Sequence, residues 1–160
     1  MFELKNISAS SKQELYAELT QQVRGLLHGE HDLIANAANF SALLYHALPD
    51  VNWVGFYFLK DRELVVGPFQ GKPACVRIAM GKGVCGTAAA KRETVVVPDV
   101  NKFPGHIFCD GASLSEIVVP LVKGRDLLGM LDMDSPKLSR FDQQDRAGLE
   151  KLVSIFLASL

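Results

Sequence analysis

Residues 51–59 read Val-Asn-Trp-Val-Gly-Phe-Tyr-Phe-Leu, a run too rich in aromatic and β-branched residues for a surface helix. The turn Lys60-Asp61-Arg62 follows, so the pattern predicts a hairpin with strands at about 52–59 and 62–66. The next segment, residues 67–73, contains glycine and proline and is expected to be irregular. The chain should therefore build its core around a sheet.

Two further apolar runs, residues 116–122 and 127–134, are separated by the turn Lys123-Gly-Arg-Asp126. A turn of this kind between strand-like runs predicts a second antiparallel pair. Shorter strands are predicted at residues 74–78 and 94–97. The expected core is an antiparallel sheet of about six strands.

Four segments have helical patterns. Residues 11–14 resemble a capping box, and apolar residues at three- and four-residue steps predict helices at about 12–27 and 33–47. A short helix of small residues is predicted at 84–92, and a final helix at about 142–160. This order predicts an α+β protein, with the terminal helices on one face of the sheet and loops with short helices over a ligand pocket on the other.

Composition argues against several classes of function. Seventeen Lys and Arg against eighteen Asp and Glu give a formal net charge of -1, so no positive field would attract nucleic acid or anionic lipid. The longest apolar runs fall far short of the roughly 18 residues that a membrane-spanning helix needs. No secretory signal is visible at the N-terminus, which favours a reducing cytoplasm. The length suits one domain.

Acidic side chains interrupt the second pair of apolar runs. Asp132 and Asp134 share one face of their predicted strand, about 7 Å apart at strand rise, and Glu116 opens the neighbouring strand. Because a buried carboxylate without a partner is costly, the acids either sit at strand ends, in water or paired with Lys123 or Arg125, or form a cluster. Close like charges raise at least one pKa, so a cluster could bind a cation and act as a general acid.

Aromatic residues share one face of the first predicted strand. Trp53, Gly55 and Tyr57 alternate with apolar residues that point the other way. A tryptophan most often belongs to the core, but Gly55 leaves a gap between the two rings. A small apolar group could fit into that gap.

Three cysteines cannot all be paired, and their spacings match no zinc or thioredoxin motif. Cys85 lies among small apolar residues and Cys75 in a predicted strand, so each alone resembles a buried apolar residue. Cys109 lies in the irregular stretch 98–113, which is expected to form a loop over a cleft. Exposed amides or His106 could lower the pKa of Cys109, which makes it the candidate reactive thiol.

Five segments of the chain together resemble the GAF-domain free methionine-(R)-sulfoxide reductases. They are Gly-Pro-Phe-Gln-Gly-Lys-Pro-Ala-Cys75, Gly-Lys-Gly-Val-Cys85-Gly-Thr-Ala, Val-Pro-Asp-Val-Asn-Lys-Phe-Pro-Gly-His-Ile-Phe-Cys109-Asp, Ser-Glu116-Ile-Val-Val-Pro and Leu-Asp132-Met-Asp134-Ser-Pro. The resemblance covers essentially the whole chain and implies a single GAF domain over 1–160. The three cysteines together with the three acids distinguish the reductases from other GAF domains.

The resemblance implies roles for these residues. Cys109 would be the nucleophile, with Cys75 and Cys85 as the thiols that resolve and recycle it. Reduction of a sulfoxide needs a thiolate at sulfur and an acid at oxygen, and the acids could supply the proton and pair with the substrate ammonium. The resemblance implies a substrate pocket lined by Trp53, Tyr57, Glu116, Asp132 and Asp134.

The resemblance also implies partners. Thioredoxin, itself reduced by an NADPH-dependent thioredoxin reductase, would be the external reductant, and no metal or bound cofactor would be needed. A homodimer built on the helical face is expected. Two alternatives are a GAF-type module that binds a small ligand without catalysis, and a thiol redox sensor that switches a partner. The first leaves the three cysteines unexplained, and the second leaves the aromatic and acidic residues unexplained.

Overall fold

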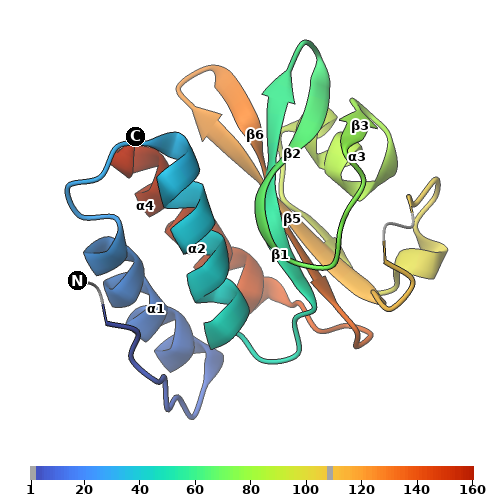
Figure 1. Cartoon of the computed structure of the whole chain (residues 1–160). Helices are drawn as coiled ribbons and strands as arrows, with labels where there is room; N and C mark the ends of the chain where they lie inside the picture. The colour runs from blue at the N-terminus through green and yellow to red at the C-terminus, as the bar shows by residue number, and fades with distance from the viewer. Residues whose placement is uncertain (1–2, 108–109) are drawn as a thin grey trace.

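Figure 1 shows a computed structural model of the chain, which describes residues 3–107 and 110–160. The helices are α1 (Lys12–Leu26), α2 (Leu33–Ala47), α3 (Gly83–Lys91) and α4 (Gln143–Ser159), with a short 3-10 helix at Val100–Lys102. The strands are β1 (Trp53–Lys60), β2 (Glu63–Gly71), β3 (Arg77–Ala79), β4 (Val95–Val97), β5 (Ser115–Lys123) and β6 (Asp126–Ser135). Within the described residues these strands form one sheet in the order β3-β2-β1-β6-β5-β4, with every neighbouring pair antiparallel.

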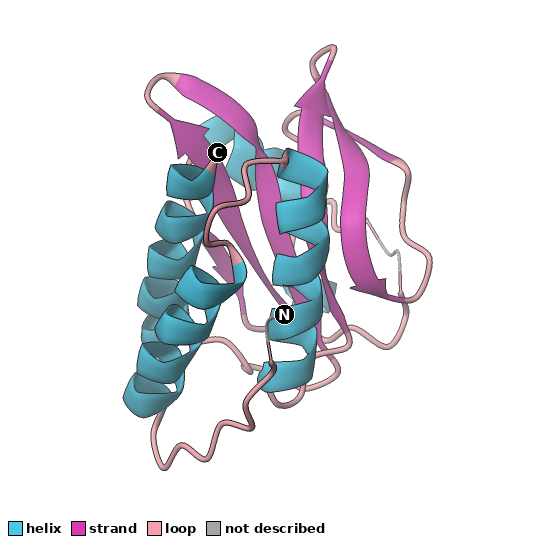
Figure 2. Ribbon diagram, turned by 60° about the vertical axis from the view of Figure 1, so that its left-hand side comes forward, coloured by secondary structure: helices cyan, strands magenta, loops and turns pink. Residues whose placement is uncertain are grey.

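The sheet is covered differently on its two faces. Helices α2 and α4 pack on one face, α1 packs against these two helices, and α3 lies on the other face (Figures 1 and 2). The α+β architecture expected from the sequence, with the terminal helices together on one face, is confirmed. No helix among the described residues is both long and apolar enough to cross a membrane.

The alternation of β1 divides the core into two parts. Phe56 points toward the helical layer, where its ring stacks on that of Phe156 from α4 with a centroid separation of 4.8 Å. Trp53 and Tyr57 point to the opposite face, into a separate apolar cluster with residues of α3. The period of two read from the sequence is therefore correct, and one face of the sheet is left for a site.

Strand β2 is longer than predicted. The expectation that residues 67–73 are irregular is wrong for residues 67–71, because β2 continues to Gly71 and pairs there with Trp53 of β1. The register shifts between Gly55 and Tyr57, so Gly67 and Pro68 together oppose one residue of β1. A bulge of this kind tolerates proline, which has no N–H to give to the ladder.

Strand β3 begins later than predicted. The prediction of a strand at 74–78 that carries Cys75 is wrong, because β3 starts at Arg77 and Cys75 lies in the segment before it. Strand β2 pairs with β3 through residues 63–65, and the Val66 N–H donates to the Val76 carbonyl at 3.0 Å just before β3 begins. Cys75 precedes this pairing, and its carbonyl accepts a hydrogen bond from the Tyr57 hydroxyl.

The start of α4 is fixed by a buried carboxylate. Asp145 is fully buried and accepts hydrogen bonds from Tyr16 Oη at 2.9 Å, Arg140 Nη1 at 3.1 Å and the Asp142 backbone N–H at 2.9 Å. Lys12 of α1 forms an ion pair with the same group. This network ties α1, α4 and the chain after β6 together.

Candidate active site

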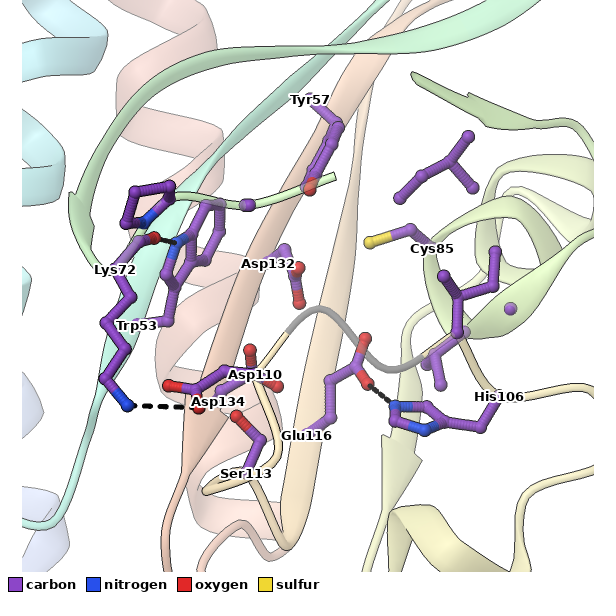
Figure 3. Close-up of a pocket in the computed structure, with 16 residues that line it drawn as sticks. Trp53, Tyr57, Lys72, Cys85, His106, Asp110, Ser113, Glu116, Asp132 and Asp134 are labelled. Carbon is purple, nitrogen blue, oxygen red and sulfur yellow. Dashed lines mark hydrogen bonds and ion pairs between the residues drawn. The ribbon is translucent and has the colours of Figure 1, made fainter. Parts of the chain in front are cut away.

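Three acids lie side by side on the face of the sheet that carries α3 (Figure 3). Asp134 of β6 stands opposite Trp53 of β1 on one side and opposite Glu116 of β5 on the other. Asp132, two residues earlier on β6, stands opposite Gly55 in the next row. The acidic trio of Glu116, Asp132 and Asp134 is therefore held by two adjacent strands, β5 and β6, beside β1.

Glu116 and Asp132 are buried and Asp134 is half-buried, so the interpretation in which these acids lie in water is wrong. Glu116 is 6% exposed and Asp132 is 7% exposed, whereas Lys123 and Arg125 lie in the exposed β5–β6 turn. Burial raises the pKa of Glu116, with a further contribution from the charge of Asp134. Burial followed by the charge of Glu116 raises the pKa of Asp132, and burial followed by Asp132 raises that of Asp134. Such a cluster holds protons at a pH where ordinary carboxyls are ionised.

The trio has few partners outside itself. His106 Nε2 lies 3.5 Å from Glu116 Oε2, with both side chains less than one-tenth exposed, and burial lowers the pKa of His106. Ser113 lies beside Asp134 and partly offsets the rise in the pKa of that carboxyl. Oδ1 of Asp132 has no hydrogen-bond partner within the described part of the chain. That oxygen is a free acceptor for a ligand.

Cys85 faces the trio from α3. Its sulfur and carboxylate oxygens of Glu116 and Asp132 all lie within 4.8 Å of one another, a spacing that would also suit a metal ion. The thiol is free and buried, and burial followed by the charge of Asp132 raises its pKa. The helix comes this close because Gly86 packs on the chain after β3, where a Cβ would stand 2.3 Å from the Ala79 carbonyl oxygen. The short helix of small residues predicted from the sequence is confirmed.

The two aromatic residues form the opposite wall. Trp53 and Tyr57 stack with ring centroids 5.9 Å apart, and Trp53 Nε1 donates to the Lys72 carbonyl at 3.1 Å. The expected gap over Gly55 is filled, because a Cβ there would stand 2.6 Å from the Trp53 ring and 2.3 Å from Cβ of Phe69. The pocket therefore opens in front of the rings and not between them.

Two other cysteines were predicted to belong to the site. Cys75 is disulfide-bonded and lies near the aromatic wall through its carbonyl, which accepts the Tyr57 hydroxyl at 3.0 Å. Cys109, predicted to be the nucleophile, lies outside the described residues. Ile107 and Asp110, the described residues on either side of it in the sequence, both line the pocket.

Sequence reasoning missed several residues that line the pocket: Lys72, Asp110 and Ser113. His106 was noted in the sequence only as a weak signal. All four lie on irregular segments, where no periodicity shows which side chains point inward. The basic residue between glycine and proline at 71–73, just before Cys75, was a signal that could have indicated Lys72.

Comparisons with known proteins agree with this geometry. The GAF domain family matches residues 11–159. The free methionine-R-sulfoxide reductase of Escherichia coli is 52% identical over 144 residues, which cover 90% of this chain and 87% of that protein.

Two solved structures are also similar. A GAF sensor protein from Burkholderia vietnamiensis is 64% identical with a TM-score of 0.90, covering 92% of this chain and 94% of that one. The free methionine-R-sulfoxide reductase of Neisseria meningitidis, solved with its substrate, is 45% identical with a TM-score of 0.95, covering 99% of this chain and 95% of that one.

Proposed function

The chain belongs to the GAF domain family and, within it, to the free methionine-R-sulfoxide reductases, and from this we propose that it reduces free methionine-(R)-sulfoxide to methionine. The observation that carries the proposal is the acidic trio in the pocket beside Trp53 and Tyr57, with two of its three members buried. A sulfoxide needs a proton at oxygen while a thiolate attacks sulfur, and buried carboxyls with raised pKa values can deliver that proton. The aromatic wall suits the methylthio end of the substrate.

The first step uses the thiolate of Cys109. It attacks the sulfoxide sulfur while a carboxyl of the trio protonates the oxygen. The oxygen then passes to the cysteine sulfur, methionine leaves, and Cys109 is oxidised to a sulfenic acid. Its place in the sequence supports this role, because the described neighbours Ile107 and Asp110 both line the pocket.

The second step regenerates the thiol. A second cysteine attacks the sulfenic acid, so that a disulfide forms and water leaves. We assign this resolving role to Cys75, because Cys75 is disulfide-bonded whereas Cys85 is a free, buried thiol with a raised pKa. Cys85 then acts later in recycling, or supports Asp132, which its sulfur faces. An external dithiol such as thioredoxin reduces the disulfide by exchange, and NADPH-dependent thioredoxin reductase restores the dithiol.

The remaining features of the proposal follow from the family resemblance. The ammonium of the free amino acid pairs with the trio, and no bound metal or organic cofactor takes part. We propose one GAF domain over residues 1–160, a homodimer built on the helical face, and a cytoplasmic location, where thiols stay reduced.

A coupled assay tests the proposal. The protein is incubated with thioredoxin, thioredoxin reductase and NADPH, with free methionine-R-sulfoxide, its S epimer or a peptide-bound sulfoxide as substrate. We expect NADPH oxidation with the free R epimer alone, and none with Cys109→Ser. Equal turnover of both epimers would remove the stereochemical assignment. No turnover of any substrate by the reduced protein would overturn the reductase and favour a ligand-binding GAF module.

A further inference from the structure

A free amino acid presents an α-carboxylate as well as an ammonium, and the acidic trio can serve only the ammonium. A carboxylate binds best to a cationic donor. Among the described residues that line the pocket, Lys72 is the side chain with a permanent positive charge. Lys72 is therefore the candidate cationic donor for the α-carboxylate.

We propose that Lys72 binds the α-carboxylate of the substrate, and that it exchanges its present partner Asp110 for that carboxylate when the substrate enters. The inference rests on the reductase function proposed above. In this role Lys72 selects free methionine sulfoxide over sulfoxides whose carboxyl group is blocked.

The backbone of Lys72 is anchored, whereas its side chain is largely exposed. Its carbonyl accepts the Trp53 indole N–H at 3.1 Å, so its backbone is anchored to the aromatic wall. Its side chain is 70% exposed, and Nζ lies 3.3 Å from Asp110 Oδ1. Rotation of the Lys72 side chain alone can therefore move its ammonium across the pocket mouth, without any change in the backbone.

The present ion pair is easy to exchange. An ion pair with one largely exposed member is weak, since water competes for both charges. Asp110 also accepts the Ala112 backbone N–H at 3.0 Å and the Asn52 amide at 3.5 Å. These two hydrogen bonds remain when the Lys72 ammonium moves away, so the Asp110 carboxylate keeps hydrogen-bond donors.

The arrangement also fits the geometry of an amino acid. Its ammonium and carboxylate sit on one carbon, so their binding groups must be neighbours. Asp110 lies close enough to Asp134 for its charge to contribute to the raised pKa of Asp134. Lys72, Asp110 and Asp134 gather at one end of the pocket and Cys85 lies at the other (Figure 3). Asp134 and Lys72 can thus hold the two charged groups together, with the sulfoxide directed toward Cys85.

Steady-state kinetics on the full chain tests the inference. The substrates are free methionine-R-sulfoxide and its α-amide, which keeps the ammonium and removes the carboxylate charge. A small dithiol serves as reductant, so that docking of a protein reductant does not enter the result. We expect Lys72→Met to raise KM for the free acid about tenfold and to leave KM for the amide unchanged, since a charged hydrogen bond is lost only with the acid. Lys72→Arg should restore most of the preference.

The matched control is Lys137→Met. Lys137 is a similarly exposed lysine, paired with Asp50 at 2.8 Å and outside the pocket lining, so its loss should leave both KM values unchanged. An equal rise in KM for acid and amide in Lys72→Met, or a wild type that does not distinguish them, would overturn the inference. If the wild type reduces neither sulfoxide, the proposed function fails. Calorimetric binding of the same two ligands to wild type and Lys72→Met then decides the role of Lys72, and failure to bind either overturns that too.

Discussion

The imidazole Nε2 of His106 lies 3.5 Å from Oε2 of Glu116, and this pair closes the acidic trio on the side away from Trp53 (Figure 3). The His106 ring shields Glu116 from water, and burial is the main cause of the raised pKa of that carboxyl. A residue of an irregular segment, His106, therefore helps to set the pKa of Glu116.

His106→Asn should move the pH dependence of the reaction. A smaller side chain admits water, which lowers the pKa of Glu116 toward its ordinary value. A general acid works only below its pKa, so the descending limb of kcat/KM against pH should shift to lower pH. A limb that stays in place or moves upward would show that His106 does not control the acid. The exposed His28→Asn is the control and should leave the profile unchanged.

Asp132→Asn should stabilise the fold at neutral pH. The pKa of Asp132 is raised in the folded protein, so the folded state retains a proton that the unfolded state releases. The contribution of Asp132 to the free energy of unfolding is therefore fully present below the ordinary carboxyl pKa of about 4. It is lost as the pH rises through the raised pKa.

Asparagine does not ionise, so this variant should exceed wild type by about 1 kcal/mol or more at neutral pH, with the advantage vanishing in acid. Urea unfolding across pH measures the difference. A constant difference at every pH would contradict the explanation, and the exposed Asp126→Asn should show no difference at all.

The two accessory cysteines should behave differently under single turnover. With one equivalent of substrate and no reductant, Cys85→Ala should still form one disulfide, whereas Cys75→Ser should stop at the sulfenic acid. Peptide mapping by mass spectrometry, with dimedone to trap sulfenic acid, distinguishes the two. A disulfide that contains Cys85 in the wild type would reverse our assignment. In the native oxidised protein the buried Cys85 thiol should resist alkylation until the chain is unfolded.

Asp145→Ala should be the most damaging of these changes to stability. It leaves the buried guanidinium of Arg140 without its carboxylate and removes the hydrogen bond to Tyr16. Loss of one partner in a buried pair costs about 3–5 kcal/mol, so the denaturation midpoint should fall steeply. Glu63→Gln breaks the exposed pair with Arg77 and should cost less than about 1 kcal/mol. Similar losses in both variants would contradict the importance of burial.

The helices and central strands could be predicted because their patterns are periodic. The alternation in β1 correctly placed Trp53 and Tyr57 on one face, and the spacing of Asp132 and Asp134 placed both acids on that same face. The burial of the acids could not be predicted, because it depends on α3 and on residues 98–107 and 110–114 packing over the sheet.

The errors in the prediction came from long-range pairing. Gly67 and Pro68 are locally unfavourable in a strand, but the bulge opposite β1 accommodates them. Lys72 and His106 lie on irregular segments, whose course depends on contacts such as the Trp53 hydrogen bond. Such contacts join residues far apart in the sequence, so no local periodicity shows which way these side chains point.

The acids stand on β5 and β6, whereas Cys75 precedes β3 and Cys85 belongs to α3, so the groups that hold a ligand and the groups that carry sulfur occupy different elements. Replacement of all three cysteines by serine would leave the charges and the aromatic wall in place. The product would be an amino-acid receptor without turnover. A sensor and an enzyme on this scaffold thus differ by a few sulfur atoms, and each could arise from the other without refolding.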